Sequence, residues 1–133
     1  MSDKDTLLPP DRSEENLDPE DWEATRALGH RMLDDMMDYM KTVADRPAWQ
    51  EIPEQVVARL HEPLPLESAD ESLVYQQFKR DVLPYPLGNI HPRFWAWVIG
   101  TGTPMGVLSE LLAATMNPNM GGGVQAPYLV EKQ

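Results

Sequence analysis

The sequence predicts a mostly α-helical chain, and two observations lead to this prediction. In the first half of the chain, apolar residues recur at three- and four-residue spacing, which is the repeat of one face of an α-helix. At two points an Asp or Thr stands directly before a proline, an order typical of helix N-termini. The chain has 133 residues, of which 41% are hydrophobic and 25% charged. This composition is typical of one globular domain or of a piece of a larger one.

The N-terminal part is predicted to be a leader followed by a long helix. Residues 1–17 are polar and acidic, and we interpret them as mobile. Asp18, followed by Pro19 and two acidic residues, predicts a helix with Asp18 as its N-cap, and Arg46-Pro47 predicts its end. The helix has a methionine-rich apolar stripe, which favours core packing or a subunit interface over a peptide-binding groove. The stripe consists of Leu28, Met32, Leu33, Met36, Met40 and Val43.

The middle of the chain predicts two more helices joined by a proline-rich spacer. Residues 53–60 favour a short helix, whereas residues 62–66 are expected to be extended, because a proline keeps its predecessor out of the helical region. An amphipathic helix is predicted over about 68–83, and Pro84 ends it. Its inward residues are predicted to be Leu73, Val74, Phe78 and Val82.

The last third is predicted to contain an extended aromatic run, a turn and two helices. The run covers residues 91–99, and Thr103 with Pro104 predicts the start of a helix that continues to about Met116. A glycine-rich loop follows, and the next helix starts at Ala126-Pro127. The predicted inward face of the first helix consists of Val107, Leu108, Leu111 and Leu112.

Charge and composition narrow the possible functions. The formal net charge of −11 argues against nucleic acid as a partner, because binding phosphates requires clustered Lys and Arg. The start is acidic, and no apolar stretch reaches the roughly 18 residues of a membrane span, so we expect a cytoplasmic protein. The absence of cysteine excludes disulfides and thiolate metal sites. Residues 84–133 carry only two acidic and two basic side chains, so we expect further chain or a partner subunit to cover their apolar surface.

Few residue patterns point to chemistry. The three histidines are far apart in sequence and form no known ligand motif, so we expect no metal site. His91 has either a structural hydrogen-bonding role or a place at the edge of a pocket. The turn of residues 100–103 is either a capped turn or a contact for a carboxylate or phosphate. We interpret Asp34, Asp35 and Asp38 as a solvated helix face. No Ser, Cys or Lys stands beside a base partner, so no nucleophile is predicted.

A series of motifs follows in order along the last third of the chain: His91-Pro92-Arg93-Phe94-Trp95, Pro104, the helix with Leu108, Leu111 and Leu112, Asn117-Pro118-Asn119-Met120, and residues 126–131. In order and spacing these motifs resemble the group II pyridoxal-phosphate-dependent amino-acid decarboxylases. That family includes glutamate and aromatic-L-amino-acid decarboxylases, and the motifs that start at His91 and Asn117 look closest to the glutamate branch. Residues 29–39 and Arg46-Pro47 also resemble the leading helix of the family and its end, so the resemblance covers about residues 20–133.

The resemblance implies the helical N-terminal part of an aspartate-aminotransferase-like α/β enzyme of fold type I. Residues 18–88 would be a dimerisation segment, and residues 89–133 would form the substrate side and lead into a cofactor-binding large domain that is missing here. It further implies a homodimeric carboxy-lyase with an amino-acid substrate and pyridoxal 5′-phosphate as cofactor. The lysine that binds the cofactor lies downstream in the family, so we expect this chain alone to be inactive, with no catalytic, cofactor-binding or metal-binding residue.

The resemblance implies four substrate-binding residues: Trp97, Gly100, Thr101 and Asn119. Trp97 falls where enzymes for aromatic acids place Tyr and those for glutamate place Gln. A Trp leaves less room and offers one N–H donor, which favours an apolar or aromatic substrate side chain. Gly100 and Thr101 fall near the contact to the substrate carboxylate, and Asn119 near a loop that reaches the neighbouring subunit's site. The alternative function is a stand-alone helical interaction or dimerisation module derived from such an enzyme.

Overall fold

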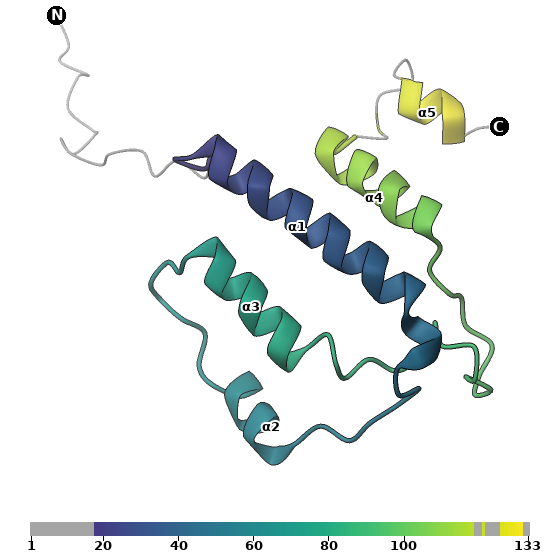
Figure 1. Cartoon of the computed structure of the whole chain (residues 1–133). Coiled ribbons are helices and arrows are strands. Elements are labelled where there is room, and N and C mark those ends of the chain that lie inside the picture. Colours follow the sequence, from purple (N-terminus) through teal and green to yellow (C-terminus); the bar gives the residue numbers. More distant parts are fainter. Residues whose placement is uncertain (1–17, 119–120, 122–125, 132–133) are drawn as a thin grey trace, which may run out of the picture.

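The structure, a computed structural model, describes residues 18–118, 121 and 126–131. In these ranges all regular secondary structure is helical, which confirms the prediction of a mostly α-helical chain (Figure 1). No helix in this part of the chain combines the length and the apolar character that a bilayer span requires. The predicted leader, residues 1–17, and Asn119 lie outside the described residues. The elements in order are α1 (Trp22–Lys41), the 3-10 helix η1 (Val43–Asp45), α2 (Glu54–Leu60), α3 (Glu71–Asp81), α4 (Pro104–Met116) and α5 (Ala126–Glu131).

At the N-termini of α1, α3 and α4, a side chain accepts hydrogen bonds from the first turn of the helix. The prediction of Asp18 as the N-cap of α1 is wrong: Asp21 has this role, and its Oδ1 accepts from the backbone N–H groups of Glu23 and Ala24 at 2.9 and 3.0 Å. One carboxylate satisfies two N–H groups that have no partner within the helix, so α1 begins at Trp22. Thr103 caps α4 as predicted, accepting from the N–H of Gly106 at 3.0 Å.

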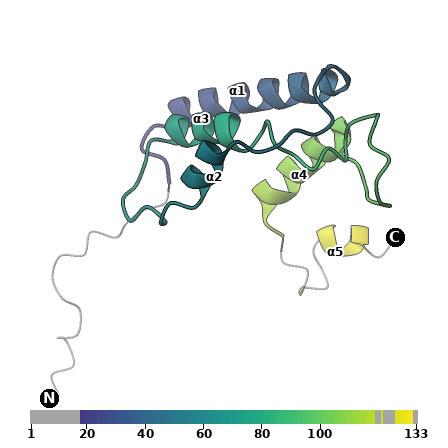
Figure 2. The same ribbon diagram turned by 90° about the horizontal axis from the view of Figure 1, so that it is seen from below.

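Helices α1 and α3 lie side by side, and polar side chains join them (Figures 1 and 2). The residue numbers of the joined pairs rise together, so the two helices run parallel. The interpretation of Asp35 as merely solvated is therefore wrong, because it binds two side chains of α3. The pairs are Thr25–Glu71, Arg31–Ser72, Asp35–Tyr75 and Asp35–Lys79, with donor–acceptor distances of 3.4, 3.3, 2.7 and 2.9 Å.

Helix α2 is joined to the end of α3 through a buried carboxylate. The side chain of Asp81 is only 6% exposed and accepts hydrogen bonds from Arg80 and Arg59, each with a shortest N–O distance of 2.6 Å. These bonds, that from Arg80 first, hold the pKa of Asp81 well below its usual range. The same carboxylate raises the pKa of both guanidinium groups. The α2–α3 contact thus depends on an ionised aspartate.

The described part of the chain buries few apolar side chains, namely Leu28, Val56 and Tyr75. The predicted burial of the inward faces of α3 and α4 is wrong within this chain. On α3 the buried residues are Tyr75 and Asp81. Periodicity identifies the apolar face of a helix, but not whether its covering partner lies in the same chain. The faces that were predicted to be inward and are exposed consist of Leu73, Val74, Phe78 and Val82 on α3, and Val107, Leu108, Leu111 and Leu112 on α4.

Candidate functional site

Three of the four predicted substrate-binding residues, Trp97, Gly100 and Thr101, lie in the segment between α3 and α4. The predicted extended run over residues 91–99 is wrong, because turns and bends at residues 91–93 and 96–98 interrupt it. The N–H of Phe94 donates to the carbonyl of His91 at 2.9 Å. The side-chain amide of Asn89 donates to the carbonyl of Gly100 at 3.0 Å and so closes residues 89–100 into a loop, called here the aromatic loop.

The tip of the aromatic loop exposes large apolar side chains. Trp95 is 92% exposed, Trp97 73% and Val98 105%. Trp97 also has a φ of 40°, a left-handed conformation that costs a bulky residue on the order of 1–3 kcal/mol. Strained backbone of this kind is found at ligand clamps and active sites, where neighbouring structure maintains it. The tip therefore has the properties of a surface that contacts another molecule or another part of a protein.

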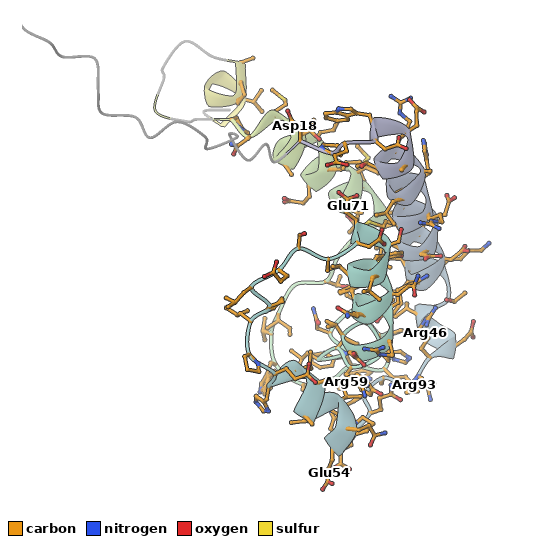
Figure 3. The ribbon with its side chains drawn as sticks, turned by 90° about the vertical axis from the view of Figure 1, so that its left-hand side faces the viewer. Asp18, Arg46, Glu54, Arg59, Glu71 and Arg93 are labelled. Carbon is orange, nitrogen blue, oxygen red and sulfur yellow. The ribbon has the colours of Figure 1, made fainter. Side chains whose placement is uncertain are left out.

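The base of the aromatic loop is fixed to the segment that follows η1. His91 is 4% exposed, its Nε2 lies 3.1 Å from the carbonyl oxygen of Arg46, and its Nδ1 accepts from the N–H of Arg93 at 3.0 Å. Figure 3 shows Arg46 and Arg93 at the same end of the molecule, opposite Asp18. Of the two roles considered for His91, the structural one is observed, because backbone groups engage both ring nitrogens.

A close backbone approach adds to this contact. Gly88 has a φ of 90°, and a Cβ built on it overlaps the carbonyl oxygen of Ala48. Close by, the side-chain amide of Gln50 donates to the carbonyl of Pro84 at 2.7 Å. Residues 46–50 and 84–91 are therefore held together at three points, and the loop starts from a fixed position.

The turn at residues 100–103 leads from the aromatic loop into α4. Thr103 caps the helix, so a capped turn, one of the two alternatives, is observed. A Cβ at Gly100 or Gly102 would meet nothing within 4 Å, and Thr101 is exposed. This leaves space at the turn for a ligand, and a contact from Gly100 and Thr101 to a carboxylate stays a prediction.

Two apolar hollows lie beside these elements. One, of about 280 Å³, joins the end of α1 to the turn and is lined by Met37, Met40, Lys41, Val43, Ile90, Gly102 and Pro104. The other, of about 580 Å³, lies between α1 and α3, where Leu28 and Met32 face Val74 and Phe78. At this second groove, burial and the bond to Asp35 raise the pKa of Tyr75 to about 12.

The described lysines do not fit an aldehyde cofactor. Lys79 forms an ion pair with Asp35 at 2.9 Å, and its ammonium lies 4.8 Å from the centre of the Tyr75 ring. The bonds from Lys79 and then Tyr75 lower the pKa of Asp35. Lys41 is exposed in the last turn of α1. In the ranges given above, no group of three or more His, Cys, Asp or Glu side chains is placed to hold a metal ion.

Comparison with known proteins finds partial similarity to plant enzymes, several of which are named as amino-acid decarboxylases. No protein-family model matches the chain. Phenylacetaldehyde synthase of Arabidopsis thaliana is 31% identical over 102 residues, which are 74% of this chain and 20% of that protein. Tryptophan decarboxylase 2 of Oryza sativa subsp. japonica is 27% identical, over 78% of this chain and 21% of the relative. Aromatic-L-amino-acid decarboxylase of Catharanthus roseus is 27% identical, over 85% and 23%. The chain thus spans about a fifth of the length of these relatives.

Proposed function

We propose that this chain is the N-terminal part of a group II pyridoxal-phosphate-dependent decarboxylase, which releases the α-carboxylate of an L-amino acid as CO2. The observation that carries the proposal is the similarity to plant enzymes named as decarboxylases of tryptophan, tyrosine and aromatic L-amino acids, over 78–85% of this chain. The order of motifs from His91 to Glu131 supports the same family. The fold of the whole enzyme is then aspartate-aminotransferase-like, with this helical part at its start.

In this proposal the aromatic loop forms the wall of the pocket that faces the substrate side chain. Trp97 contacts that side chain through its indole ring, and this is supported by its exposure and its strained backbone. Gly100 and Thr101 lie at the open turn and bind the substrate carboxylate, and Asn119 reaches the neighbouring subunit's site. An indole wall favours an apolar or aromatic substrate, which agrees with the substrates in the names of the relatives.

The cofactor, pyridoxal 5′-phosphate, is bound by residues outside this chain. The described lysines do not fit it, since Lys79 forms an ion pair with Asp35 and Lys41 is exposed on a helix surface. No catalytic step therefore comes from these residues, and we expect the 133-residue chain to be inactive by itself. In this proposal the chain shapes the side of the pocket that faces the substrate and takes part in assembly of the dimer.

Assembly as a cytoplasmic homodimer is part of the proposal, and the exposed apolar surface supports it. On α3, Leu73, Val74, Phe78 and Val82 are exposed, and on α4 so are Val107, Leu108, Leu111 and Leu112. Apolar side chains gathered in this way on a surface mark contacts with another part of a protein, which in this proposal are the rest of the enzyme and its second subunit.

The decisive experiment offers a panel of L-amino acids to the full-length protein loaded with pyridoxal 5′-phosphate and measures CO2. We expect release from tyrosine, tryptophan or phenylalanine and little from glutamate. No release from any amino acid would refute the decarboxylase. A stable, folded chain that ends at Gln133 without a downstream lysine would favour the interaction module instead.

Substrate selection by Trp97 has its own test. Trp97→Gln is expected to change the relative kcat/KM among substrate side chains, since it replaces an apolar wall with an amide. Trp95→Gln alters an exposed tryptophan of the same loop and serves as the control. Unchanged relative kcat/KM in Trp97→Gln would refute the assignment.

A further inference from the structure

We infer that His91 and Asn89 are positioning residues, which hold the aromatic loop at its base and thereby set the place of Trp97 at its tip. The inference rests on the proposed function, in which Trp97 contacts the substrate side chain. It assigns a specificity role to two side chains that lie at the loop's base.

The ring of His91 joins two parts of the chain that are 45 residues apart. Because Nδ1 accepts from the N–H of Arg93, the ring proton is on Nε2, which donates to the carbonyl of Arg46. Arg46 directly follows η1 at the end of α1, the longest helix described. Because His91 is only 4% exposed, water competes little for either of its hydrogen bonds. His91 therefore ties the loop to the segment that follows η1 through a backbone carbonyl, whose position does not depend on a rotamer.

Asn89 fixes the other end of the loop. Its amide donates to the carbonyl of Gly100 at 3.0 Å, so the two ends of the aromatic loop are held next to each other. Gly100 stands just before the capped start of α4. The loop is thus anchored to the segment that follows η1 through His91, and Asn89 holds its two ends together just before α4.

The tip depends on these anchors, because its own side chains are exposed. Trp95, Trp97 and Val98 are each more than two-thirds exposed, and the hydrogen bonds described for the loop lie at residues 88–94 and at Gly100. The φ of 40° at Trp97 persists only while the surrounding structure maintains it. A displacement of about 1 Å in a substrate-positioning group is enough to cost about 100-fold in rate. Loss of a hydrogen bond at the base of the loop is therefore expected to shift Trp97 and so to change its contact with the substrate.

Two substitutions of His91 test its two hydrogen bonds one at a time. His91→Asn places an oxygen near Nδ1, so it keeps the acceptor for Arg93 and loses the donor to Arg46. His91→Gln places an amide near Nε2, so it keeps that donor and loses the acceptor. Asn89→Asp keeps the shape of Asn89 without its N–H donor. His61→Gln, at an exposed histidine after α2, is the matched control.

Two measurements on the full-length protein decide the inference. The first is hydrogen exchange of peptides covering residues 88–100, which does not require activity. We expect about tenfold faster exchange in His91→Asn and Asn89→Asp, since each loses one hydrogen bond that holds the loop, and no change in His61→Gln. The second is the ratio of kcat/KM for L-tyrosine to that for L-alanine, which we expect to fall about tenfold in the same two variants. His91→Gln is expected to keep a larger part of the wild-type ratio than His91→Asn.

The outcomes distinguish this inference from the proposed function. Unchanged exchange in His91→Asn and Asn89→Asp overturns the inference, whether or not the protein is active. Faster exchange with an unchanged substrate ratio also overturns it, because the two residues then only stabilise the loop. Absence of CO2 release by the wild-type protein refutes the decarboxylase, and exchange alone then decides whether the two residues hold the loop.

Discussion

Substituting Gly88 by alanine tests the contact between residues 46–50 and the start of the aromatic loop. Gly88 has a φ of 90°, which a side chain rarely tolerates, and its added methyl group would overlap the carbonyl oxygen of Ala48 and lie 3.1 Å from the carbonyl carbon. Both atoms belong to the backbone, so no side-chain rotation relieves the overlap. The two segments have to move apart.

The cost has two parts. A residue with a Cβ pays about 1–2 kcal/mol for the left-handed conformation. Separating the segments also weakens the bonds His91–Arg46 and Gln50–Pro84, each contributing about 1 kcal/mol. We therefore expect Gly88→Ala to lower the free energy of local opening by about 3 kcal/mol, which corresponds to an increase in hydrogen exchange of about 100-fold.

Hydrogen exchange by mass spectrometry on the intact protein, read on peptides covering residues 84–94, measures this effect. Gly29→Ala is the matched control, because a Cβ at Gly29 within α1 meets nothing within 4 Å. There the same substitution is expected to stabilise the helix by about 0.5–1 kcal/mol and to leave residues 84–94 unchanged. Equal exchange of these peptides in Gly88→Ala and wild type would contradict the close approach to Ala48.

Three further predictions concern stability. Tyr75→Phe removes the bond to Asp35 and is expected to cost about 1.5 kcal/mol in urea unfolding, whereas Tyr39→Phe, which loses no described hydrogen bond, should stay within about 0.5 kcal/mol of wild type. The lowered pKa of Asp81 means that its ionised form stabilises the fold above its unfolded pKa of about 3.9 and that this contribution is lost as the pH falls below it. Asp81→Asn should therefore be less stable at pH 7 and lose less stability between pH 5 and pH 3; equal acid sensitivity in urea titrations would exclude this role. Thr103→Ala should destabilise α4 by about 1 kcal/mol and speed exchange at residues 105–108, whereas Thr103→Ser should keep the cap.

Local sequence signals predicted where helices occur, because capping and proline chemistry act within a few residues. Thr103-Pro104 marked the start of α4 correctly, and the short helix at residues 54–60 was also found. The error at α1 arose because Asp18 and Asp21 are both acceptable caps, and it is Asp21 whose carboxylate accepts from the N–H groups of Glu23 and Ala24. Sequence alone does not distinguish two candidate caps of the same chemistry three residues apart.

Contacts between distant segments were missed, because they depend on how the helices pack. Asp35 was interpreted as a solvated residue, yet Tyr75 and Lys79, four residues apart on α3, both bind it. Their spacing places them on one helix face, a signal that would have suggested a shared acidic partner. The role of Asp81 was missed in the same way, since nothing in its local sequence shows that Arg59 of another helix reaches it.

In the candidate site, too, local motifs could be recognised in the sequence, whereas contacts between distant segments could not. Motif order leads to Trp97, Gly100 and Thr101 as substrate-binding residues, which stays a prediction, but it does not show the fixed base of their loop, because that base depends on Arg46, Ala48 and Gln50. An exposed aromatic tip on a fixed base is expected where a loop contributes to a pocket that other segments complete. A loop serving only to connect α3 and α4 would need neither the strained Trp97 nor a buried histidine bonded at both nitrogens. Both features are explained if the tip must reach a defined position relative to another surface. The exchange and specificity experiments on His91 test whether the base of the loop sets this position.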